Sequence, residues 1–242
     1  MKLDPANHHL WKPDKQFAKN HLLIPLIVVG LILFLLEKTG IELWLADQWF
    51  AWEGGSWTLG HNWFAYDVIH HFGKQMIIAF GVVLWCAFII SLRVHRFRMW
   101  RRPLGYVLAC MVLLPYLIAS LKKFNTVVCP WDLARYGGKL MYRHTFEHHL
   151  TLHSPGRCFP SGHASGGFAL IALYFACLPY TRRPWVLLLP GVIFGTVFAL
   201  GQEARGAHFL SHDLWSLTIC WFGAVLLFYV IRPHHARGVC KS

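Results

Sequence analysis

Long apolar runs alternate with short polar segments along the whole chain. Most of these runs approach the roughly 20 residues that a helix needs to cross the hydrocarbon core of a bilayer. The pattern therefore predicts an all-α fold, an integral membrane bundle of six transmembrane helices in one domain, residues 1–242. The predicted spans are Leu22–Leu36, Gln75–Leu92, Leu104–Leu121, Pro160–Pro179, Val186–Gln202 and Leu214–Ile231. The first is short, and we expect it to extend at one or both ends.

The segments between the spans differ in composition. Residues 37–73 are rich in Trp, Gly and His, which is typical of a segment in the membrane interface rather than of a crossing. Residues 122–159 form a long polar loop, and residues 1–20 and 232–242 form basic tails. The loop and the interfacial segment are separated from the tails by an odd number of predicted spans, so they should share one side of the membrane.

The overall composition agrees with a membrane protein. Hydrophobic residues make up 56% of the chain and the mean hydropathy is +0.42, whereas a soluble domain of this size would be more polar. The net charge of +12 could indicate a nucleic-acid partner, but the basic residues flank the apolar runs, and orientation in a bilayer is a sufficient cause. We therefore expect the protein to lie in a membrane and to have no nucleic-acid partner.

The distribution of basic residues predicts the orientation. With the N-terminus inside, 14 of the 23 Lys and Arg residues fall on the inner side. This orientation places both termini in the cytoplasm of a cell with a bacterial-type inner membrane. Residues 37–73 and 122–159 then face the periplasm.

The fourth predicted span begins with an unusual stretch, residues 158–167, that is rich in small residues. Pro160 suits the first turn of a helix, and Ser161 is placed to cap it. Gly162 and His163 follow, at a helix end that attracts anions such as phosphate. The alternative interpretation is a plain helix cap with a seam for helix packing.

Alternating spans would bring this stretch to the same membrane face as two other polar clusters. One is Lys122-Lys123 at the end of the third span, and the other is Arg205–Asp213 between the last two spans. Ionisable residues at membrane depth are costly and usually functional. Lys123 has a simpler interpretation, as a charge that extends to the interface.

Together the clusters contain the groups that cleavage of a phosphate ester requires. Lys122 and Arg205 can bind phosphate oxygens, and His163 is the natural proton donor. His208 is the candidate nucleophile, provided that another group holds its second ring nitrogen. Asp213 and His212 are the two candidates for that group, and a helix through residues 205–212 would place Arg205 and both histidines on one face. Asp213 could instead cap the last span, and His212 could be a solvated interfacial residue.

These residues resemble the pattern of the type 2 phosphatidic acid phosphatase superfamily. Members of that superfamily are integral membrane proteins that remove phosphate from lipid phosphates. That pattern is Lys, six residues, Arg-Pro; then Pro-Ser-Gly-His; then Ser-Arg, five residues, His, three residues, Asp. The second part is complete at residues 160–163, and the resemblance covers residues 75–231. Among the departures from this pattern, Cys129 and Gln202 stand where Arg is expected, and His212 stands where Asp is expected.

The resemblance implies a divergent lipid phosphatase that needs no metal or other cofactor. His208 would form a phosphohistidine intermediate and His163 would protonate the leaving group, with Asp213 or His212 as the orienting group. The phosphate-binding residues would be Lys122, Ser161, Gly162 and Arg205, with Arg157 or Arg135 replacing the Arg absent at position 129. The substrate would be a phosphorylated membrane lipid, such as an isoprenyl diphosphate, a glycerophospholipid phosphate or a lipid A phosphate.

Seven cysteines are present, and Cys129 and Cys158 are the only two on the predicted outer side, where oxidation is possible. We therefore hypothesise a Cys129–Cys158 disulfide that ties the first cluster to the second. The alternative is a pair of buried thiols.

Three other functions were considered from the sequence. A phosphotransferase that passes the phosphoryl group to another lipid would use the same histidine. A His-rich membrane protein that binds haem or a metal is suggested by the 16 histidines, although these lie mostly in tails and loops. A transporter is disfavoured because the spans are continuous and lack charged residues at their centres.

Overall fold

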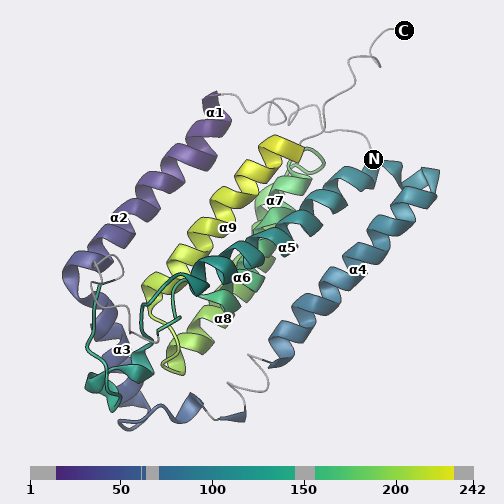
Figure 1. The fold of residues 1–242 in the computed structure, drawn as a ribbon. Helices are drawn as coiled ribbons and strands as arrows, with labels where there is room; N and C mark the ends of the chain where they lie inside the picture. The colour runs from purple at the N-terminus through teal and green to yellow at the C-terminus, as the bar shows by residue number, and fades with distance from the viewer. Residues whose placement is uncertain (1–14, 61, 64–70, 145–155, 232–242) are drawn as a thin grey trace.

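The computed structural model describes residues 15–60, 62–63, 71–144 and 156–231. These residues form helices and connecting segments, arranged as an elongated bundle (Figure 1). The α-helices are α1 (Lys15–Ala18), α2 (Ile24–Thr39), α3 (Ile41–Trp52), α4 (Gly73–Arg93), α5 (Arg101–Lys123), α6 (Gly162–Phe168), α7 (Ala172–Cys177), α8 (Leu189–Ala204) and α9 (Leu210–Ile231). A π-helical turn, Lys19–Leu23, joins α1 to α2, and short 3-10 segments extend or connect the other helices.

Five helical stretches in the described part of the chain are long and apolar enough to cross a membrane. They are Lys15–Thr39, Gly73–Arg93, His95–Lys123, Pro184–Ala204 and Leu210–Ile231. Each includes one predicted span, and the first extends beyond the predicted Leu22–Leu36 at both ends. The predicted fourth span corresponds to a shorter apolar helix, Gly162–Cys177. At 1.5 Å per residue it is about 24 Å long, against a hydrocarbon core of about 30 Å.

The short helix Gly162–Cys177 forms the centre of the bundle. Ala164, Ala172 and Phe175 are completely buried and belong to a core that α5 and α9 complete. Close packing against α8 depends on two glycines, because a Cβ atom on Gly167 would lie 2.4 Å from the backbone nitrogen of Gly195. Small residues at such a crossing allow the two backbones to approach closely.

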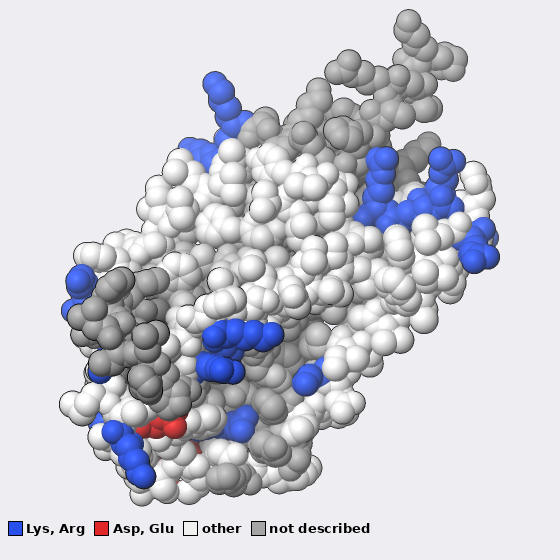
Figure 2. Space-filling model, in the orientation of Figure 1, with Lys and Arg blue, Asp and Glu red and all other residues white. Residues whose placement is uncertain are grey.

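The two ends of the bundle differ. The start of α1, the end of α9 and the α4–α5 connection lie at one end, and α3 and the α8–α9 connection lie at the other (Figure 1). On the face shown in Figure 2, Lys and Arg side chains gather at the first end and again in the half of the molecule towards the second, with an uncharged zone between them. The predicted tail 232–242 lies outside the described residues, as does most of the tail 1–20.

The predicted interfacial segment includes the helix α3, which is too short to cross a bilayer. It packs against the segment after α5 through a small apolar cluster that includes Ala46, Leu133 and Tyr136. Arg135 reinforces this contact, since its guanidinium donates two hydrogen bonds to the Asp47 carboxylate, at 2.7 and 2.5 Å. This layer covers the end of the bundle that contains the polar clusters.

Candidate functional site

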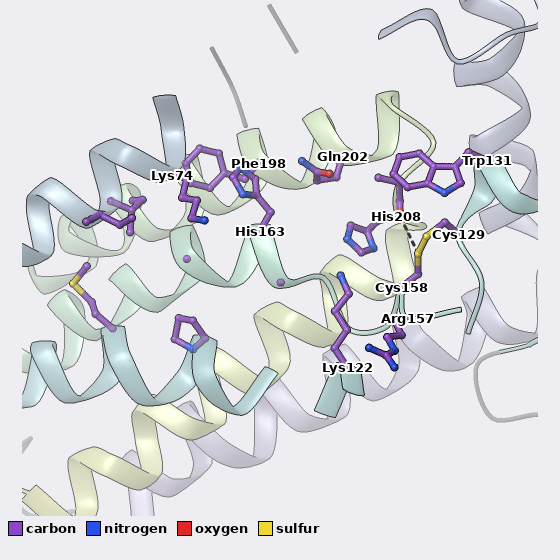
Figure 3. Close-up of a pocket in the computed structure, with 17 residues that line it drawn as sticks. Lys74, Lys122, Cys129, Trp131, Arg157, Cys158, His163, Phe198, Gln202 and His208 are labelled. Atoms are coloured by element: carbon purple, nitrogen blue, oxygen red, sulfur yellow. Dashed lines mark hydrogen bonds between the residues drawn. A yellow bond between two sulfur atoms is a disulfide. The ribbon is translucent and has the colours of Figure 1, made fainter. Parts of the chain in front are cut away.

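A cavity of about 600 Å³ opens at that end of the bundle (Figure 3). Its polar lining comes from four helices and two connections: Lys74, Lys122, Arg157, His163, Gln202 and His208. Its apolar lining includes Ile77 and Ile78 of α4 and Met111 and Pro115 of α5. The cavity is thus amphipathic, as a site for a lipid with a charged headgroup must be.

The structure brings Lys122, His163 and His208 together although they are far apart in the sequence. All three line the same cavity, from α5, from α6 and from the α8–α9 connection. In Figure 3, the Lys122 and His208 side chains point towards each other across the cavity, and His163 projects from the first turn of α6. This convergence is the arrangement that alternating spans predicted.

His208 is not on a helix, so the condition under which Arg205, His208 and His212 would share one helical face is not met. Helix α8 ends at Ala204, and Gly206 adopts a left-handed conformation with φ of +68°. The amides of Gly206 and Ala207 donate to the carbonyls of Glu203 and Gln202, both at 2.9 Å, which is the pattern of a glycine helix stop. The chain therefore turns before His208 and starts a new helix at Leu210.

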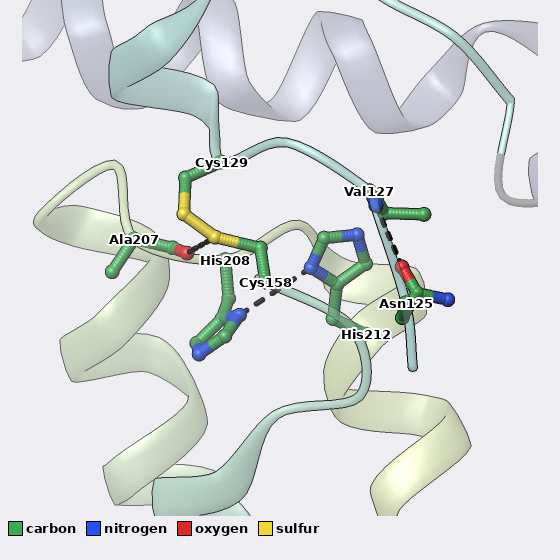
Figure 4. The surroundings of a disulfide bond; sticks show 7 residues. All are labelled: Asn125, Val127, Cys129, Cys158, Ala207, His208 and His212. Carbon is green, nitrogen blue, oxygen red and sulfur yellow. Dashed lines mark hydrogen bonds between the residues drawn. A yellow bond between two sulfur atoms is a disulfide. The ribbon is translucent and has the colours of Figure 1, made fainter. Parts of the chain in front are cut away.

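His208 nevertheless contacts His212, which lies in the first turn of α9. Their Nδ1 atoms are 3.3 Å apart, close enough for one ring to donate a hydrogen bond to the other (Figure 4). Both side chains are buried. Burial, followed by the nearby positive charge of Lys122, lowers the pKa of His208 well below its ordinary value, so the imidazole is neutral at pH 7.

Asp213, the other candidate for the orienting group, is not among the residues that line the cavity. Its carboxylate is buried and faces the Ser161 hydroxyl and the Glu203 carboxyl. Ser216 also ties this region together, because its hydroxyl contacts the carbonyls of Ser161 and His212, at 2.8 and 3.0 Å. Asp213 therefore lies next to the turn that begins α6 and carries His163.

The start of α6 differs in detail from the prediction. Ser161 is the N-cap residue, but its hydroxyl makes no capping hydrogen bond, and Pro160 precedes the helix rather than entering its first turn. Gly162 and His163 line the cavity, and the His163 ring lies 4.6 Å, centroid to centroid, from the Phe198 ring of α8. The aromatic contact holds His163 at the cavity wall.

The four predicted phosphate-binding cations have different positions. Lys122 and Arg157 line the cavity. Arg205 is buried behind the lining, where its Nη1 donates to Gln202 Oε1 at 3.4 Å, and it is Gln202 that reaches the cavity. Arg135 is not part of the lining, because its guanidinium binds Asp47 on α3. Of the two arginines considered for the missing charge at position 129, only Arg157 is at the site.

Cys129 and Cys158 form a disulfide beside the cavity, with their Cα atoms 5.4 Å apart. The Cys158 sulfur lies 3.4 Å from the carbonyl oxygen of Ala207, the residue before His208 (Figure 4). The bridge therefore joins the segment after α5 to the segment before α6, next to the turn that carries His208.

Several lining residues were not assigned to the site from the sequence, among them Lys74, Phe198 and Gln202. Lys74 precedes an apolar run, where a basic residue is ordinary, and Phe198 lies inside one. Gln202 was identified only as a departure from the family pattern. The burial of Glu42 was also missed: its carboxylate accepts a hydrogen bond from the Ser211 amide at 3.3 Å, and burial raises its pKa to about 7.

Comparison with known proteins gives one positive result. No curated protein and no solved structure matches the chain significantly. The sequence model of the PAP2 superfamily matches residues 103–235, which is more than half of the chain and includes Lys122, His163 and His208. The resemblance noted from the motifs is thereby confirmed, and the chain belongs to the PAP2 superfamily.

Proposed function

We propose that the protein is a lipid phosphatase that cleaves a phosphomonoester or a diphosphate at the outer face of a membrane. PAP2 proteins act on phosphorylated substrates. The observation that carries the finer proposal is the single cavity, which joins Lys122, His163 and His208 to an apolar wall from α4 and α5. A soluble phosphate ester would not need that wall, whereas the hydrocarbon chain of a lipid would.

The proposed mechanism has two steps. The Nε2 atom of neutral His208 attacks phosphorus, while the bond from phosphorus to the leaving oxygen breaks and His163 gives that oxygen a proton. Water then gives a proton to His163 and attacks the phosphohistidine, the bond from phosphorus to Nε2 breaks, and inorganic phosphate leaves with both histidines regenerated. Lys122 and Arg157 offset the charge on the phosphoryl oxygens during both steps.

His212 is the proposed orienting group. For Nε2 of His208 to be the nucleophile, its proton must be on Nδ1, and Nδ1 of His212 lies within reach as an acceptor, at 3.3 Å. Asp213 has a supporting role in this proposal, through Ser161 and the start of α6.

For the membrane arrangement, we propose six crossings with both termini in the cytoplasm. The central helix Gly162–Cys177 would be the sixth crossing, because it is apolar and surrounded by the longer helices. A fluorescent reporter that matures only in the cytoplasm should report signal from fusions at either terminus. A signal from only one of the two fusions would contradict an even number of crossings.

The activity is tested by phosphate release from a panel of phosphorylated lipids in detergent. We expect the wild-type protein to release phosphate and His208→Ala to reduce the rate at least a thousandfold. His95→Ala is the matched control, because His95 is exposed and lies in the α4–α5 connection at the opposite end of the bundle. Both variants should give the same elution profile and helical content.

The stability of a phosphate label on the protein, in acid and in base, distinguishes the proposed intermediate from other phosphorylated residues. Wild-type protein quenched during turnover should contain phosphohistidine, which survives base but not acid, and His208→Ala should contain none. Turnover that persists in His208→Ala would refute the assignment. Label that appears on an added lipid alcohol instead of in free phosphate would identify a phosphotransferase.

A further inference from the structure

The cavity contains a basic residue outside the family pattern, Lys74, in the first turn of α4. Its side chain is exposed and points into the cavity beside His163 and Phe198, as Figure 3 shows. The sequence pattern of the superfamily, as matched here, begins after this helix, at residue 103. The role of Lys74 must therefore be argued from its position.

Packing fixes the start of α4 at the His163 side of the cavity. Gly73 is buried against α8, and a Cβ atom there would lie only 2.5 Å from the Phe198 ring, so a larger residue would push the two helices apart. The Phe198 ring in turn contacts the His163 ring, with 4.6 Å between centroids. One aromatic side chain thus links the turn that carries Lys74 to the candidate proton donor.

The positive charges of the cavity form two groups. Lys122 lies on the His208 side with Arg157, and Lys74 lies on the His163 side (Figure 3). Within the described residues, no Asp or Glu lines the cavity to neutralise either group. A substrate with one phosphate would engage the first group only, and a substrate with two would engage both.

The chemistry of the site indicates where the second phosphate would lie. The nucleophile faces the phosphoryl group that is transferred, and the proton donor faces the oxygen that leaves. A cation beside the proton donor therefore stabilises negative charge on the leaving group. The leaving group of a lipid monophosphate is a neutral alcohol, whereas that of a lipid diphosphate is a phosphate.

We propose that the substrate is a lipid diphosphate and that Lys74 binds its inner phosphate, which makes Lys74 a specificity-determining residue. This inference rests on the proposed phosphatase function. In the first step, Nε2 of His208 bonds to the terminal phosphorus, and the bond from that phosphorus to the bridging oxygen breaks. The bridging oxygen keeps the electron pair, takes the proton of His163 and leaves as the lipid monophosphate next to Lys74. Hydrolysis of the phosphohistidine then releases inorganic phosphate.

The apolar wall adjoins Lys74 on the same helix. Ile77 and Ile78 follow it by one turn, and Met111 and Pro115 of α5 also line the cavity. A hydrocarbon chain attached to the inner phosphate would enter this part of the cavity directly. The order of groups along the cavity is then nucleophile, terminal phosphate, inner phosphate and hydrocarbon chain.

The test compares farnesyl diphosphate with farnesyl monophosphate, which share one hydrocarbon chain. We expect wild-type kcat/KM to be at least tenfold higher for the diphosphate. Lys74→Gln should lower kcat/KM for the diphosphate at least tenfold and for the monophosphate less than threefold, and Lys74→Arg should retain most of the preference. Lys123→Gln is the matched control, because Lys123 is exposed and absent from the cavity lining.

Inhibition by inorganic diphosphate gives a second measurement that needs no lipid. It should inhibit wild type more strongly than inorganic phosphate does, and Lys74→Gln should abolish the difference. Equal losses on both lipids in Lys74→Gln, or a wild-type preference for the monophosphate, would overturn the assignment and leave the phosphatase function intact. A wild-type protein that releases phosphate from neither lipid, nor from any other in the panel, would overturn both proposals.

Discussion

The Nδ1 atom of His208 lies 3.3 Å from the Nδ1 atom of His212, four residues along the chain. The family pattern has a carboxylate at the second position, so an imidazole stands at that position in this chain, and we propose that it orients His208. A neutral imidazole can accept the proton of His208 but cannot offset the positive charge that develops on it. The next residue along the chain, Asp213, is a buried carboxylate.

This relationship predicts the effects of two substitutions at position 212. His212→Ala removes the acceptor, so we expect kcat to fall about a hundredfold with KM little changed. His212→Asn offers an amide oxygen in a similar place and should recover at least a tenth of the wild-type kcat. Steady-state kinetics with one lipid at a fixed pH would measure both. A purely structural role for His212 would make the two variants equally inactive and equally unstable.

The Cys129–Cys158 bridge gives a prediction about stability. It closes a loop with a sequence separation of 29, and loop entropy alone assigns such a bridge about 3–4 kcal/mol. The double variant Cys129→Ser/Cys158→Ser should therefore melt several degrees lower than wild type. It should lose activity at temperatures just below the wild-type melting temperature, where the wild-type protein is still active. Cys86→Ser is the matched control, because Cys86 is an exposed free thiol. Mass spectrometry after alkylation, with and without reductant, would reject the bridge if both thiols react without reductant.

The sequence predicted the helices, and the convergence of the site residues, more accurately than it predicted the local geometry of the site. Hydropathy determines which runs are helical spans, and alternation of the spans is enough to bring Lys122, His163 and His208 to one end. The turn at Gly206 was missed because a glycine within a polar stretch is compatible with either a helix or a helix stop. Lys74 and the Arg135–Asp47 pair were missed for another reason: only the tertiary arrangement shows which charges face the cavity and which face each other.

Burial of Glu42 predicts a pH-dependent stability whose sign can be derived. Its pKa rises from 4.5 to about 7 on folding, so the folded chain binds this proton more tightly than the unfolded chain. The stability that it contributes is fully present below pH 4.5 and is lost as the pH rises through 7, by about 3 kcal/mol in total. Glu42→Gln can still accept from the Ser211 amide but does not titrate. We therefore expect the melting temperature of the variant to exceed that of wild type at pH 8, and the difference to shrink towards pH 5. Parallel melting curves across this range would show that Glu42 does not titrate differently in the folded chain.

The crossing of α6 and α8 leads to a prediction about folding. A Cβ atom on Gly167 would lie 2.4 Å from the nitrogen and 2.6 Å from the Cα of Gly195, and backbone atoms cannot move aside as a side chain can. Gly167→Ala must therefore separate the two helices, at a cost of about 1–3 kcal/mol or more. Because α6 carries His163 and α8 carries Phe198, we expect the variant to lose activity as well as thermal stability. Gly30→Ala is the control, since a Cβ atom at Gly30 in α2 would meet nothing within 4 Å. If Gly167→Ala melts and turns over like Gly30→Ala, the two helices do not cross at these glycines, and the wall of the cavity that holds His163 must be built differently.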